Sequence, residues 1–144
     1  MKKIAMLHTS SATLAMMQQL IGDIMPEADV MHLVEESMIK QVMKAGGVTP
    51  NIAARIADYV HIDEKADCEI FITACSSIGT AVEQCQFMTP LQLARIDGAM
   101  VEKAISLGEN IAVLATVATT MKPTLAYVQR KVQASGKQCT VTPI

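Results

Sequence analysis

CEIFITACSSIG, residues 68–79, is the stretch that decides the fold. An apolar run containing Ile and Phe is followed at once by a cysteine, two serines and a glycine. We interpret the run as a β-strand buried on both faces, which is typical of a parallel sheet covered by helices. A short helix is expected over 76–86, so the polar turn lies where the strand ends, and ligands bind at such ends in parallel sheets.

Expected strands and helices alternate along the chain on both sides of this stretch. Further strands are expected within residues 3–9, 28–34, 89–97, 110–116 and 138–144. Helices are expected within 11–25, 35–47, 49–66, 98–108 and 119–136. Strands that alternate with helices predict an α/β fold: a mostly parallel sheet with helices on both faces, arranged as a Rossmann-like three-layer sandwich.

Local signals set the expected helix ends. Thr49 is a good N-cap with Pro50 at the first helical position, and Gly46 can close the helix before it. Pro123 is expected in the first turn of the last helix. Helical spacing in 11–25 places five apolar residues on one face, namely Leu14, Met17, Leu20, Ile21 and Ile24.

Composition excludes several classes of protein. The 144 residues are 51% hydrophobic and 18% charged, which is ample for a buried core and argues against disorder. The net charge of −2 comes without a basic stripe, so nucleic-acid binding has no support. No apolar run approaches the roughly 20 residues that a membrane span needs.

The four cysteines show neither a CxxC motif nor Cys/His ligand spacing, so we expect free thiols and no metal site. The start, MKKIAMLHTSS, resembles a signal peptide, but its apolar run is too short to be one. Together these features favour a cytoplasmic protein.

Three turns rich in hydroxyl groups follow expected strands. They contribute a first group of Thr9, Ser10 and Ser11, a second of Cys75, Ser76 and Ser77, and a third of Thr116, Thr119 and Thr120. Together with the helix N-termini that follow, they predict a binding site for a carboxylate or another small anion. Each Ser or Thr alone is an ordinary helix cap, so the prediction depends on three turns sharing one sheet edge.

Cys75 has two interpretations. At a helix N-terminus its thiolate can act as a base or a nucleophile. Alternatively it is a small buried residue that ends a strand. A phosphatase loop is disfavoured because no Arg follows the cysteine, and the first turn, HTSSAT, lacks the glycines of a dinucleotide-binding loop.

The sequence also resembles the aspartate/glutamate/hydantoin racemase superfamily. The matching segments, in family order, are IAMLHTSSAT, HLVEESMI, AGGVTPNIAARI, ITACSSIG, RIDGAMVEKAISLG and IAVLATVATTMKPTL. The resemblance implies chemistry without a cofactor at a carbon beside a carboxylate. It implies that Cys75 removes the α-proton, and that Thr9, Ser10, Ser76, Ser77, Thr116, Thr119 and Thr120 grip the substrate.

The chain departs from the family pattern in its second half. The resemblance implies an N-terminal domain over 1–97 and a partial, incomplete second unit over 98–144, without the second family cysteine. A racemase-like enzyme acting on a small carboxylate, such as an amino acid or a hydantoin-type compound, is therefore expected. Its expected protein partner is a second copy of the chain in a homo-oligomer. The alternatives are a single-cysteine decarboxylase- or isomerase-like enzyme and a non-catalytic anion-binding domain.

Overall fold

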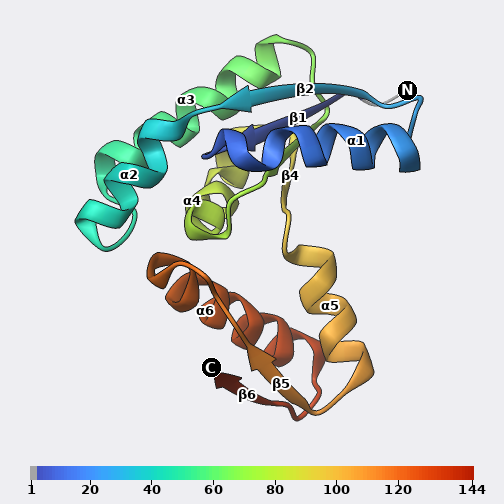
Figure 1. Cartoon of the computed structure of the whole chain (residues 1–144), viewed down its shortest axis with the longest axis vertical. Helices are drawn as coiled ribbons and strands as arrows, with labels where there is room; N and C mark the ends of the chain where they lie inside the picture. The colour runs from blue at the N-terminus through green and yellow to red at the C-terminus, as the bar shows by residue number, and fades with distance from the viewer. Residues whose placement is uncertain (1–2) are drawn as a thin grey trace.

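Four parallel strands form the larger sheet of the computed structural model, which describes residues 3–144 (Figure 1). Their order is β2-β1-β3-β4, with bounds β1 Lys3–His8, β2 Asp29–Val34, β3 Ile70–Thr73 and β4 Gln92–Arg95. Leu7 of β1 is in register with Leu33 on one side and Thr73 on the other. The predicted α/β fold with a parallel sheet is confirmed.

Helices cover both faces of this sheet (Figure 1). One face carries α1 (Leu14–Ile24), which follows the short 3-10 helix η1 (Ser11–Thr13). The other carries α2 (Glu36–Ala45), α3 (Pro50–Lys65) and a helical segment divided into η2 (Ser76–Ile78), α4 (Gly79–Gln84) and η3 (Cys85–Met88). Thr49 caps α3, because its hydroxyl accepts a hydrogen bond from the Ile52 N–H at 3.4 Å.

The main core lies between the sheet and the helices α2, α3 and α4. Alternate strand residues point toward it, and Leu7 and Phe71 are fully buried there. Met38 of α2 and Ile56 of α3 meet them from the helices. Burial of such side chains stabilises the fold by roughly 1.5–3 kcal/mol each.

A second, smaller core lies farther along the chain. It is built by α5 (Gly98–Leu107), β5 (Asn110–Val113), α6 (Ala118–Ser135) and β6 (Thr140–Pro143). The strands β5 and β6 pair in parallel as a separate two-stranded sheet, and Ile111 and Val113 of β5 are buried with Val128 of α6. The last two predicted strands thus exist but do not extend the main sheet.

Helix α1 buries less of its apolar face than the sequence pattern predicts. The helix has no fully buried residue, and Leu20 and Ile24 are 43% and 71% exposed. Helical periodicity locates a face but does not show what covers it. Leu14, Met17 and Ile21 are half-buried, so only part of the apolar stripe is covered.

Pro123 lies deeper in its helix than expected. Because α6 begins at Ala118, the proline falls in the second turn rather than the first. Its ring lacks an N–H group, so the Thr119 carbonyl four residues earlier loses its helical hydrogen bond.

A buried guanidinium joins the two cores. Arg95, at the end of β4, donates two hydrogen bonds of 2.7 Å to the carboxylate of Asp97. Its Cζ atom lies 4.0 Å from the ring centre of Tyr127 in α6, and a longer contact reaches Glu83 in α4. Paired and stacked in this way, a guanidinium can be taken out of water without a large loss of stability.

No helix within residues 3–144 is both long enough and apolar enough to cross a membrane.

Gly79 leaves the space that Arg95 occupies. A Cβ atom at position 79 would lie 2.5 Å from the Arg95 Cζ, an impossible contact. We therefore expect Gly79→Ala to lower the free energy of unfolding by roughly 2–4 kcal/mol, measured by urea denaturation.

The matched control is Gly22→Ala in α1, where nothing lies within 4 Å of the added methyl group. This change should raise stability by up to about 1 kcal/mol through helix propensity. Equal effects of the two substitutions would contradict the packing of Arg95 against Gly79.

Asp63, in the last turn of α3, is a buried carboxyl group without a hydrogen-bond partner among residues 3–144. Burial raises its pKa from 3.8 to about 6. The folded protein therefore binds a proton that the unfolded chain releases, and stability falls as pH rises from about 4 to about 6.

Asp63→Asn removes this ionisation. We expect the variant to be more stable than the parent protein by roughly 1–3 kcal/mol at pH 8, and by little at pH 4, measured by urea denaturation at both values. Asp58→Asn, an exposed change on the same helix, should have no such effect. A gain that is the same at both pH values would show that folding does not raise the pKa of Asp63.

Candidate functional site

Two of the three hydroxyl-rich turns lie on adjacent strands. The Ala74 N–H donates a hydrogen bond of 2.8 Å to the Leu7 carbonyl, so the chains that leave β1 and β3 stay side by side past the last sheet pair. Thr9 and Cys75 follow at the same sheet edge. Parallel pairing thus positions the first and second turns together, as their sequence pattern predicts.

The third turn reaches the second through hydroxyl contacts. The Ser77 Oγ lies 2.9 Å from the Thr120 Oγ1 and 3.4 Å from the Thr119 Oγ1, and Ser77 is only 5% exposed. We call Ser77, Thr119 and Thr120 the hydroxyl cluster. It lies at the start of α6, whose first turn has no side-chain cap. Free N–H groups and hydroxyls together favour an anion there.

Cys75 is half-buried at the N-cap position of η2. Its backbone N–H donates a hydrogen bond of 3.2 Å to the Thr73 hydroxyl, which fixes the turn. The side chain packs against the edge of the main core and is not enclosed by it. Cys75 thus follows a buried strand and stands two residues before the hydroxyl cluster, and its catalytic role stays a prediction.

The remaining predicted residues have varied surroundings. Thr9 is buried, whereas Ser10 caps η1 by accepting a hydrogen bond of 3.2 Å from the Ala12 N–H. Ser76 is half-buried, and its hydroxyl helps to lower the pKa of the nearby Asp97 carboxyl group. Thr116 is exposed and makes no side-chain contact with the hydroxyl cluster. These positions stay predictions for substrate binding.

Asp97 is a site residue that the sequence pattern did not reveal. Although burial acts to raise its pKa, hydrogen bonds and charge from Arg95, with a hydrogen bond from Ser76, hold it below its ordinary value. The carboxylate is thus paired with the buried Arg95 and lies near the turn that carries Cys75. Its position at the end of the strand expected within 89–97 was the only sequence feature that pointed to it.

Glu35 anchors another polar network at this sheet edge. It follows β2 and receives hydrogen bonds from the Ser37 N–H, Arg55 and Tyr59. Although burial acts to raise its pKa, these hydrogen bonds lower it to about 2. The segment HLVEES pointed to this region, but the partners on α3 are visible only in the folded chain.

His8 and His32 form a pair on the α1 face of the sheet. The His8 Nε2 lies 3.0 Å from the His32 Nδ1, and the His8 Nδ1 lies 3.5 Å from the Thr13 hydroxyl. Burial lowers the pKa of both rings, and the charge of His32 lowers that of His8 further. His8 is fully buried, so it stabilises the structure at the strand end.

A groove with a volume of about 690 Å³ borders the hydroxyl cluster. Its walls are the loop between α2 and α3, one face of α4 and the first turns of α6. Ser77 and Thr119 line it, together with Thr49, Thr80 and Gln84. Lys122 is the one charged residue among those that line it.

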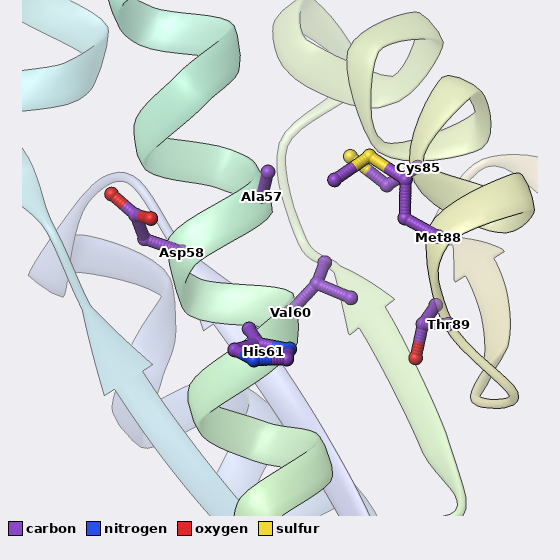
Figure 2. A pocket seen from close by; sticks show the side chains of 7 residues that line it. All are labelled: Ala57, Asp58, Val60, His61, Cys85, Met88 and Thr89. Atoms are coloured by element: carbon purple, nitrogen blue, oxygen red, sulfur yellow. The ribbon is translucent and has the colours of Figure 1, made fainter.

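A second, smaller pocket of about 250 Å³ lies between α3 and η3 and contains none of the predicted site residues. Figure 2 shows Cys85 and Met88 facing Ala57 and Val60 across it. Burial raises the pKa of the Cys85 thiol, which donates to the Ala81 carbonyl at 3.4 Å. That thiol is part of the core. Within residues 3–144 no cluster of three metal-ligating side chains is present.

The fold is that of an α/β protein with a parallel sheet, and hydroxyl groups from the second and third turns meet at the start of α6. A model of the family described as Asp/Glu/Hydantoin racemase matches residues 4–142, and the chain belongs to this family. The resemblance seen in the sequence is thereby confirmed.

The fold is also similar to a solved structure, glutamate racemase from Aquifex pyrophilus. The TM-score is 0.73 at 16% sequence identity, over 98% of this chain and 54% of the racemase chain. This chain therefore spans about half the length of that relative. Comparison with curated proteins gives no match.

Asp97→Asn should remove the negative charge that pairs with the buried Arg95. We expect a loss of roughly 3 kcal/mol in the free energy of unfolding at pH 7, because the buried Arg95 loses its counter-charge. Since the pKa of Asp97 is lowered in the folded state, the difference from the parent protein should shrink as pH falls below about 4.

Glu102→Gln is the control, because it removes one partner of the exposed pair with Lys131. Its effect on urea denaturation should stay below about 1 kcal/mol. If Asp97→Asn lowered the free energy of unfolding by as little as this, the pair between Arg95 and Asp97 would contribute little to stability.

Proposed function

We propose that this protein removes a proton from the carbon beside a carboxylate, with the Cys75 thiolate as the base. The observation that supports this most is the hydroxyl cluster, which lies two residues from Cys75 and joins α6 to the second turn. Membership of the Asp/Glu/Hydantoin racemase family supports the same chemistry. The substrate would be a small carboxylate, such as an amino acid or a hydantoin-type compound.

The side chains have distinct roles in this proposal. Hydroxyls of Ser77, Thr119 and Thr120 and the free N–H groups at the start of α6 hold the carboxylate. The α-proton passes to the Cys75 Sγ, and the electron pair left on the carbon spreads into the carboxylate. Donors already in place stabilise that growing charge. These steps require no cofactor.

Inversion at the carbon needs a second acid on its opposite face. Cys68 and Cys85 are buried, and burial raises the pKa of both thiols. Cys139 belongs to the second core, where its Sγ lies 3.7 Å from the Gly108 carbonyl. Among residues 3–144, Cys75 is thus the one thiol at this sheet edge.

With a single thiol at the site, the reaction can proceed by either of two routes. A second copy in a homo-oligomer can supply the other acid, and the exposed apolar side chains of Leu20 and Ile24 favour such association. Alternatively, one thiolate exchanges or replaces a proton on one face, as decarboxylase- and isomerase-like relatives would. The four free thiols agree with a cytoplasmic setting for either route.

Proton–deuterium exchange tests the proposal. In heavy water, NMR should show loss of the α-proton signal from a candidate amino acid such as glutamate or alanine. Cys75→Ser should slow the exchange by at least about 100-fold, because the hydroxyl is a far weaker base at neutral pH.

Cys139→Ser is the matched control and should leave the exchange rate unchanged. Exchange that persists in the Cys75 variant would exclude the thiolate as base. Carboxylate binding without any exchange in the parent protein would instead assign the fold to the non-catalytic alternative.

A further inference from the structure

A pocket with a volume of about 270 Å³ lies in the smaller core, between α5, β5 and α6. Neither a predicted site residue nor a charged side chain is among the described residues that line it. The lining is apolar except for Thr124. The volume exceeds that of a buried apolar cavity of roughly 150 Å³ that holds benzene. The pocket is therefore large enough for a small hydrocarbon molecule.

Thr124 of α6 contributes the one hydroxyl group of this lining. The residue is 7% exposed, and its Oγ1 has no hydrogen-bond partner in the part of the chain that the structure describes. A threonine inside a helix often donates to the carbonyl one turn earlier, but this hydroxyl does not. A buried polar group without a partner costs stability. A ligand that hydrogen-bonds to Thr124 would recover that cost.

The pocket lies along the open edge of β5, because the consecutive residues 111–114 line it. The Thr140 N–H donates to the Glu109 carbonyl at 2.7 Å, so the odd-numbered residues of β5 direct their backbone groups toward β6. The Ala112 N–H and C=O therefore face the opposite edge. No strand within residues 3–144 pairs with β5 on that side. The pocket is thus not covered by a further strand of the described chain.

Exposed side chains mark the entrance of the pocket. Met100 of α5 and Leu114 after β5 line it and are exposed to solvent. Val101 and Val128 line it too, and both are buried in the smaller core. The pocket therefore leads from the surface into the core, and a small molecule can enter it without unfolding the protein.

We propose that this pocket binds a small neutral ligand that combines an aromatic or branched hydrocarbon body with one hydroxyl group. The hydrocarbon body lies against the apolar lining, and the hydroxyl group of the ligand forms a hydrogen bond with the Thr124 Oγ1. Because the described lining carries no charge, an acid or an amine would lose its hydration there without gaining a partner. This site is separate from the carboxylate site proposed beside Cys75.

NMR titration with benzyl alcohol and toluene tests the proposal, because the two molecules differ only by the hydroxyl group. The parent protein should bind both. Thr124→Val keeps the shape of the side chain and removes its hydroxyl group. The dissociation constant for benzyl alcohol should therefore rise roughly fivefold, whereas that for toluene should stay the same or fall.

Ala104→Leu fills part of the pocket and should abolish the binding of both molecules. Ala54→Leu is the matched control, because it adds the same side chain at an exposed position of α3 outside the pocket. It should leave both dissociation constants unchanged.

Four results would overturn the proposal. The parent protein binds neither molecule, Ala104→Leu binds both as the parent does, Thr124→Val weakens both molecules equally, or it weakens neither. Pairing of a second copy along β5 would block the pocket instead. Analytical ultracentrifugation would then show a dimer that binds neither molecule, and this outcome also contradicts the proposal.

Discussion

A positive charge buried between two cores is the constraint on which the rest of the structure depends. Arg95 can leave water only because Asp97 accepts two hydrogen bonds from it and Tyr127 lies against its flat face. The same arrangement ties the end of β4 to α4 and α6. Ser76 also helps to lower the pKa of Asp97, so this buried pair lies beside the turn that carries Cys75.

Most of the fold could be predicted from the sequence, because each buried strand is a short apolar run with a turn signal after it. The six strands and the cap at Thr49 are examples. The division of the strands between two sheets could not be predicted, because an apolar run indicates that a strand is buried but not which strand it pairs with. For the same reason, the sequence predicted that α1 has an apolar stripe but not how much of that stripe stays exposed. The division into domains at residue 97 stays a prediction.

The candidate site was predictable where it depends on strand ends and hidden where it depends on packing between helices. Hydroxyl groups after strands indicated Ser77 and Thr119, and the structure brings these two into contact. Thr116 carried the same signal but is exposed, because the chain turns into α6 two residues later. Lys122 lies just beyond such a turn, and its relation to the groove depends on how α4 and α6 lie together. Partners of this kind are set by tertiary contacts rather than by spacing along the chain.

The residues of α6 that line the groove are spaced at regular intervals along the helix. Lining positions recur along α6 once per turn, from Thr119 through Lys122 to Ala126. Each step moves a side chain about 5 Å farther from the hydroxyl cluster. A substitution at one of these positions would therefore change the wall of the groove one turn at a time, with no change in the turns that surround Cys75.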